Sequence, residues 1–192
     1  MKKVLFVINT LGGAGAEKAL LELLKRFPEN EYEVLLYVLL AQGELISTAM
    51  MNYYLQECGV KSILLPALEY MRTDKNAEPD PVYIKEKLQM QLELHPGAEI
   101  YITQGYICRN AYGEIDNLQR GGSDYTASLI GAAINASEIQ IWTDIDGMHN
   151  NDPRIVDKTA PVRQLHFEEA AELAYFGAKI LHPTCIQPAK YC

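Results

Sequence analysis

The stretch LQRGGSDY at residues 118–125 carries two adjacent glycines between a cation, Arg120, and the pair Ser123-Asp124. Glycines let a backbone approach a ligand closely, and the apolar segment that follows, through Ala133, is helix-like. A helix N-terminus offers free N–H groups and a positive dipole end, which suit an anion. A strand-like segment at 139–142 then leads into an acidic loop. This order predicts an α/β ligand site at the ends of strands.

Strand-like and helix-like segments alternate along the rest of the chain. Apolar patterns predict strands at 4–8, 32–40, 61–65, 100–103 and 139–142, and helices at 17–27, 45–56, 82–94, the segment ending at 133, and 167–176. A hairpin or long loop is expected at 106–119. Alternation of this kind favours an α/β fold with a mostly parallel sheet and helices on both faces.

Composition limits the functional classes. Of the 192 residues, 48% are hydrophobic, enough for the core of one α/β domain. The net charge of −8 argues against binding to nucleic acid, which needs a basic face. No apolar run approaches the roughly 20 residues that span a bilayer, and residues 4–8 are too few for a signal peptide. The four cysteines lack metal or disulfide spacing and indicate reduced thiols of a cytoplasmic protein.

Six blocks of sequence, taken in order, resemble the aspartate kinases of the amino acid kinase superfamily. They lie between about residue 42 and the C-terminus: QGELIST (42–48), ITQGYI (102–107), RGGSDYT (120–126), WTDIDG (142–147), NDPR (151–154) and FGAKILHP (176–183). Six ordered blocks are far more specific than a single glycine-rich loop. The resemblance implies the three-layer α/β sandwich of that superfamily, with a mostly parallel sheet, present here in truncated form.

The resemblance implies transfer of the γ-phosphoryl group of ATP, with Mg²⁺, to the side-chain carboxylate of L-aspartate, the first step towards lysine, threonine and methionine. Catalysis of this kind rests mostly on positioning and charge stabilisation. By matching position, the aspartate-binding residues are Glu44, Arg120 and Ser123, the catalytic carboxylate is Asp124, and the nucleotide-binding residues are Thr143, Asp144, His149, Arg154 and Lys179. Family members are generally oligomeric, which implies a homo-oligomer; no membrane or nucleic-acid partner is expected.

Several of these residues have a structural alternative. Arg120 suits a bidentate grip on a carboxylate but also a surface ion pair. Taken alone, Glu44 is typical of a solvated helix residue. Asp124 is typical of a helix N-cap, and Lys179 of a solvated lysine near a helix end. His149 stands where many relatives have a tyrosine, so an aromatic contact to adenine or ribose is expected there.

Residues 1–40 follow a different pattern. Their strand, glycine-rich turn TLGGAGA (10–16), helix and second strand resemble the start of a two-Rossmann-domain glycosyltransferase. Aspartate kinases instead open with a strand running into Lys-Phe-Gly-Gly-Thr-Ser, whose lysine contacts the transferred phosphates. The corresponding turn here, NTLGG (9–13), has no lysine. We therefore expect a chimera of segments 1–40 and 41–192.

The missing lysine predicts weak or absent kinase activity. One alternative is a non-catalytic chimeric fragment that at most binds nucleotide, suggested by the abrupt change of pattern and by an end that precedes the next strand of a complete domain. A glycosyltransferase is less favoured, because nothing after residue 40 resembles a nucleotide-sugar domain.

Overall fold

The computed structural model of this chain describes residues 2–8, 32–38, 42–119, 121–142, 147–152, 155–176 and 183–190. The chain divides into two compact units, Met1–Ile46 and Ser47–Cys192. The sequence predicts that segments 1–40 and 41–192 derive from two different families. The division into compact units does not test this, so it stays a prediction.

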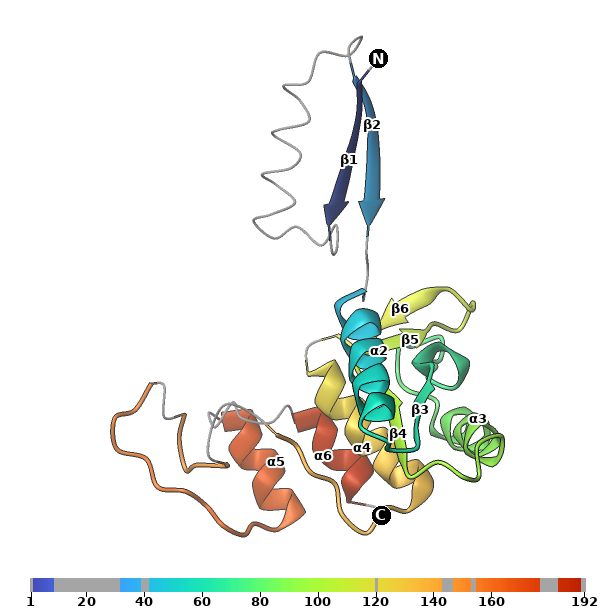
Figure 1. The fold of residues 1–192 in the computed structure, drawn as a ribbon. Coiled ribbons are helices and arrows are strands. Elements are labelled where there is room, and N and C mark those ends of the chain that lie inside the picture. Colours follow the sequence, from blue (N-terminus) through green and yellow to red (C-terminus); the bar gives the residue numbers. More distant parts are fainter. Residues whose placement is uncertain are drawn as a thin grey trace. The chain divides into compact units, whose positions relative to one another are not determined.

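The first unit contains two parallel strands, β1 (Lys2–Ile8) and β2 (Tyr32–Val38). They pair along their whole length, from Lys2 opposite Tyr32 to Ile8 opposite Val38 (Figure 1). Both strands were predicted, and both are confirmed. The predicted glycine-rich turn and the helix at 17–27 lie outside the described residues.

The second unit alternates helices and short strands. Helix α2 (Gln42–Glu57) begins in the first unit and runs into the second. After it come β3 (Ser62–Leu65), the 3₁₀ turn η1 (Ala67–Glu69), α3 (Pro81–Glu93), β4 (Ile100–Thr103), β5 (Ile107–Arg109), β6 (Ile115–Asn117), α4 (Gly122–Ile134), α5 (Phe167–Phe176), η2 (Pro183–Cys185) and α6 (Ile186–Ala189). Among the described helices, none combines the length and apolarity needed to cross a membrane.

Strand pairing follows the predicted α/β pattern. Strands β3 and β4 are parallel, from Ser62 opposite Ile100 to Leu65 opposite Thr103, and α3 lies between them in the chain. Strands β5 and β6 form the predicted antiparallel hairpin. Helix α4 packs against both α3 and α6 (Figure 1). The expected α/β architecture with parallel neighbours is therefore confirmed.

The core of the second unit lies around β3, η1, α3 and β5. The buried apolar residues there are Leu65, Ala67, Tyr70, Met71, Ile84, Leu88, Ile107 and Cys108. The Tyr70 hydroxyl shares a 2.5 Å hydrogen bond with Thr103 Oγ1 at the end of β4. Burial raises the pKa of Tyr70 to about 12, so this hydroxyl keeps its proton in the core.

Helix α3 begins at an aspartate that is also an ion-pair partner. Asp80 Oδ1 accepts the Tyr83 backbone N–H at 3.0 Å, and Pro81 occupies the first helical turn. Arg72 Nη2 donates to Asp80 Oδ2 at 2.6 Å, while its guanidinium stacks 3.8 Å from the centroid of the Tyr83 ring. The hydrogen bond from Arg72 is the main reason that the pKa of Asp80 lies below its ordinary 3.8.

Replacing Asp80 with alanine is expected to lower the free energy of unfolding by about 1–2 kcal/mol, because both the cap and the ion pair are lost. Asp80→Asn keeps a good capping side chain and is expected to lose less than about 1 kcal/mol. Since the folded pKa of Asp80 is depressed, its contribution is complete above the ordinary pKa and is lost as the pH falls through the folded value. Urea titrations at pH 7 and pH 3 measure the free energy of unfolding of both variants. Equal losses of stability in Asp80→Ala and Asp80→Asn would contradict the capping role.

One predicted strand is wrong. Residues 139–142 form no strand in the described structure, and Trp142 is 87% exposed. A strand needs a partner for its backbone groups, and no described strand pairs with this segment. Ile139 instead packs across α4, where a Cβ on Gly131 would lie 2.3 Å from Ile139 Cδ1. An apolar run is therefore used here to cover a helix.

Candidate functional site

Helix α4 begins at the paired glycines. Gly121 is the N-cap, with a left-handed φ of 76°, and the helix starts at Gly122. The Gly122 N–H donates to the Gln119 carbonyl at 3.1 Å, and the Tyr125 N–H donates to the Gly121 carbonyl at 2.9 Å. Left-handed backbone costs little only for glycine. The alternative reading of Asp124 as the N-cap is therefore wrong, and Asp124 lies inside the first turn.

The turn after β4 packs directly on this helix start. A Cβ on Gly105 would lie 3.0 Å from Ser123 Cα, and one on Gly122 would lie 2.9 Å from Tyr106 Cδ2. The Tyr106 N–H donates to Thr126 Oγ1 at 3.1 Å, and the Thr126 hydroxyl donates to the Gly122 carbonyl at 2.7 Å. Strand end and helix start are thus held together by close packing and by two linked hydrogen bonds.

Two residues beside the helix start have strained backbones. Tyr106 has a φ of 71° and Gln119 a φ of 60°, values that residues with side chains rarely adopt. The Leu118 N–H donates to the Tyr106 carbonyl at 2.8 Å and holds the two segments together. Such strain costs on the order of 1–3 kcal/mol per residue and concentrates at functional sites, which favours a functional role for this region.

Gln104 organises the back of the site. Its side chain is buried, its Oε1 accepts the Ala67 N–H at 2.8 Å, and its Nε2 donates to Thr48 Oγ1 at 3.0 Å. The amide thereby joins the end of β4 to η1 and to α2. Gln104 lies within the block ITQGYI (102–107), and no role was predicted for it. The available signal was a polar amide directly after an apolar strand.

A cavity of about 570 Å³ opens between β4, the turn after it and one face of α4. The α4 residues that line it recur at helical spacing: Ser123, Thr126, Ala127, Ile130, Gly131 and Ile134. Its volume lies within the range of small-molecule sites. The cavity meets the α4 N-terminus at Ser123, so an anionic ligand there would face the positive end of the helix dipole.

The side-chain atoms near this end of the cavity that could coordinate a metal ion are oxygen atoms. Ser123, an exposed residue, lines the cavity, and Asp124 follows it in the same helical turn. Within the described residues, no three histidine, cysteine or acidic side chains are grouped so that they could hold a metal ion. Mg²⁺ usually binds through one or two carboxylates, water and substrate phosphates. Asp124 fits that limited role.

The other predicted site residues divide into two groups. Glu44 lies in the first turn of α2, within the first unit, so its convergence with Asp124 stays a prediction. His149 is buried, and its Nδ1 lies 2.8 Å from Thr159 Oγ1; its contact with a nucleotide also stays a prediction. Outside the described residues lie Arg120, Thr143, Asp144, Arg154 and Lys179.

Comparison with known proteins gives a consistent result. A model of the amino acid kinase family matches residues 7–192. The chain is 40% identical over 154 residues to lysine-sensitive aspartokinase 3 of Escherichia coli, covering 79% of this chain and 34% of that protein. It is 37% identical over 158 residues to chloroplastic aspartokinase 1 of Arabidopsis thaliana, covering 79% of this chain and 28% of that protein. The chain therefore spans about a third of the length of these relatives.

Solved structures show the same fold. The crystal structure of E. coli aspartokinase III with aspartate and ADP superposes with a TM-score of 0.72 at 40% identity, covering 79% of this chain and 34% of that one. Aspartate kinase from Synechocystis covers 98% of this chain and 36% of its own, with a TM-score of 0.61, and at 24% identity it shows the fold alone. The expected fold class is therefore confirmed.

Proposed function

Because this chain belongs to the amino acid kinase family, we propose that it is an aspartate kinase-like phosphotransferase. The reaction transfers the γ-phosphoryl group of ATP to the side-chain carboxylate of L-aspartate, with Mg²⁺ as the accompanying ion. The similarity to aspartokinases of two organisms supports the choice of substrate.

The site residues divide the work of such a reaction. Arg120 grips a carboxylate of aspartate with its planar guanidinium, and Glu44 pairs with the ammonium group. Ser123 donates a hydrogen bond to the bound amino acid. Asp124 orients substrate and neighbouring cations around the transferring phosphoryl group. Phosphoryl transfer demands positioning and charge stabilisation more than covalent chemistry, which suits this set of side chains.

The observation that carries the proposal is the packing of α4 against the turn after β4. Ser123 and Asp124 lie in the first turn of a helix whose N-terminus borders a 570 Å³ cavity. A helix N-terminus stabilises anions, and both aspartate and the phosphates of ATP are anionic. The nucleotide is proposed to contact Thr143, Asp144, His149, Arg154 and Lys179.

We propose that residues 1–40 form a Rossmann-like, glycosyltransferase-like start joined to a partial amino acid kinase domain at 41–192. The segment at 9–13 lacks the lysine that the phosphate site of an aspartate kinase uses. Loss of that cation removes charge stabilisation where negative charge develops, an effect that typically costs a factor of about 10²–10³ in rate for a single donor.

Turnover is therefore expected below about 1 per second, the lower limit of ordinary kinase rates. Formation of ADP, coupled to a spectrophotometric readout in the presence of L-aspartate and Mg²⁺, measures it. An assay without aspartate corrects for plain ATP hydrolysis. Rates between about 1 and 100 per second would show that the lysine is dispensable and would refute the impairment.

A non-catalytic nucleotide-binding fragment is the second candidate, favoured by the same missing lysine. Calorimetry separates the cases. Binding of both ATP and aspartate supports the kinase-like function, whereas binding of ATP alone, or of neither, supports the fragment. Binding of a nucleotide-sugar would instead support the less favoured glycosyltransferase.

The proposal includes a homo-oligomer in the cytoplasm. The cysteines that the structure describes, Cys58, Cys108 and Cys185, are free thiols, as a reducing compartment favours. Light scattering on a size-exclusion column measures the oligomeric state directly. A monomer at micromolar concentration would contradict this part of the proposal.

A further inference from the structure

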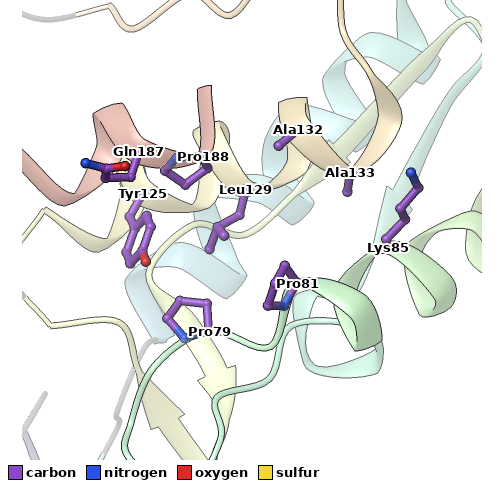
Figure 2. Close-up of a pocket in the computed structure, with 9 residues that line it drawn as sticks. All are labelled: Pro79, Pro81, Lys85, Tyr125, Leu129, Ala132, Ala133, Gln187 and Pro188. Carbon is purple, nitrogen blue, oxygen red and sulfur yellow. The ribbon is translucent and has the colours of Figure 1, made fainter. Parts of the chain in front are cut away.

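A second cavity, of about 330 Å³, lies on a different face of α4 from the candidate active site. Helix α4 contributes Tyr125, Leu129, Ala132 and Ala133, α3 and the residue pair before it contribute Pro79, Pro81 and Lys85, and α6 contributes Gln187 and Pro188. We call this cavity the α3–α4–α6 pocket. Figure 2 shows Lys85 at one end and Tyr125 at the other, with Pro81 and Leu129 between them.

The wall of the α3–α4–α6 pocket is largely preformed. Five of its nine lining residues are proline or alanine: Pro79, Pro81, Ala132, Ala133 and Pro188. Proline and alanine have almost no side-chain entropy to lose when a ligand binds. Pro79 and Pro81 flank Asp80, the residue that caps the start of α3 and fixes it. The free-energy cost of ordering the protein on binding would therefore be small.

Polar groups stand at the two ends of the pocket. Within the described residues, no ion pair or hydrogen bond engages the Lys85 ammonium, and none engages the side chain of Tyr125 or Gln187. Burial, followed by the electrostatic effects of Glu78 and Cys185, raises the pKa of Tyr125. Tyr125 therefore stays a neutral hydroxyl that donates and accepts hydrogen bonds at physiological pH.

We propose that the α3–α4–α6 pocket binds a small organic monoanion with a ring-sized apolar body, whose carboxylate faces Lys85 and whose hydrogen-bonding group faces Tyr125 and Gln187. The apolar body packs on Leu129 and on the prolyl rings. A rigid apolar pocket with a few polar groups aimed into it is the usual construction of a small-molecule site. The proposal is independent of kinase activity.

The pocket and the candidate active site share α4 as a wall. Residues Ser123, Thr126 and Ala127 face the 570 Å³ cavity, whereas Tyr125 and Leu129 face the α3–α4–α6 pocket. A ligand in this pocket therefore contacts the helix that carries Asp124. Any effect of that ligand on aspartate binding must be reciprocal, with aspartate changing the affinity of the ligand by the same factor.

The test uses ¹H–¹⁵N NMR titration of the whole chain with 3-(4-hydroxyphenyl)propionate, which has a carboxylate, one ring and a hydroxyl. A dissociation constant on the order of 1 mM is expected for so small a ligand. Shifts should cluster in α3 near residues 81–85 and in α4 near 125–133. Shifts confined to residues 101–105, on the other cavity, would overturn the assignment.

Charge is tested by Lys85→Met, which keeps the aliphatic stem of the side chain. The variant should bind the carboxylate about tenfold more weakly, the usual effect of losing a charge-assisted hydrogen bond, and should bind the uncharged amide of the same ligand as the wild type does. Lys75→Met removes an exposed lysine outside the pocket and should change neither affinity. Equal carboxylate affinity for wild type and Lys85→Met would overturn the role of Lys85.

Shape is tested by Ala132→Phe, which fills the pocket. Binding of both the carboxylate and the amide should disappear, while the NMR spectrum elsewhere stays that of a folded chain. Persistent binding of either ligand to this folded variant would place them outside the pocket and would overturn the proposal. The Lys85→Met comparison stands by itself if Ala132→Phe does not fold.

Discussion

Replacing Gly122 with alanine is expected to lower the free energy of unfolding by about 1–3 kcal/mol and to weaken binding at the start of α4. The added Cβ would lie 2.9 Å from Tyr106 Cδ2, 3.1 Å from Leu118 Cβ and 3.3 Å from Tyr106 Cα. Two of these neighbours belong to a residue whose φ of 71° is already strained, so the turn has little freedom to move aside. Relief requires α4 and the turn to separate, which displaces Ser123 from the cavity.

Urea unfolding gives the stability, and calorimetry with ATP and with aspartate gives the binding. Gly97→Ala is the matched control, since nothing lies within 4 Å of a Cβ at that position; it should change stability by less than about 0.5 kcal/mol. If Gly122→Ala behaved like Gly97→Ala, the close packing of the turn on the helix would not matter for stability. Loss of ligand binding at unchanged stability would localise the effect to the site.

The local structure around this glycine pair could be predicted from the sequence. Adjacent glycines before an apolar, helix-like segment indicate a sharp entry into a helix, and α4 starts at Gly122. The partner of that glycine could not be predicted. Tyr106 is separated from Gly122 in the sequence by the β5–β6 hairpin. The local sequence pattern of neither segment indicates that the two residues are in contact. Periodicity reports which face of an element is apolar, but not what packs against it.

The strand expected at 139–142 fails for the same reason. Its alternating apolar residues satisfy the pattern of a strand, but in the described structure the backbone has no pairing partner, and Ile139 covers Gly131 of α4 instead. The candidate site contains residues of both kinds, those that a local sequence pattern indicates and those that it does not. Ser123 and Asp124 were predicted as site residues because they adjoin a local helix signal, and their roles stay a prediction, whereas Gln104 and Thr126 make contacts with residues distant in sequence. Such roles require the tertiary structure.

Replacing Gln104 with leucine is expected to cost about 2–4 kcal/mol of stability, because a buried donor loses its acceptor. The Ala67 N–H now donates to Gln104 Oε1 at 2.8 Å, and Ala67 has no exposed surface through which water could replace that oxygen. An unsatisfied buried donor costs about 1–3 kcal/mol, and the hydrogen bond to Thr48 is lost as well. Gln89→Leu, on an exposed face of α3, removes only a hydrogen bond to Glu93 and should cost less than about 0.5 kcal/mol.

Gln104→Glu turns this network into a pH-dependent one. A protonated glutamic acid has the shape of glutamine: its carbonyl oxygen accepts the Ala67 N–H, and its O–H donates to Thr48 Oγ1 as the amide did. Burial raises the pKa of the new carboxyl in the folded state above its value of about 4.3 in the unfolded chain. The contribution of this carboxyl to the free energy of unfolding is therefore complete below its pKa in the unfolded chain. It is lost as the pH rises through the pKa of the folded state.

Urea titrations from pH 4 to pH 8 should then show Gln104→Glu close to the wild type at the acid end and progressively less stable toward neutrality. Gln104→Leu should lie below the wild type by a constant amount, since leucine does not titrate. A pH-independent loss in Gln104→Glu would mean that the carboxyl reaches water in the folded state. Gln104 also lines the 570 Å³ cavity, so in that case water from the cavity would reach the carboxyl in spite of the hydrogen bonds that join β4, η1 and α2.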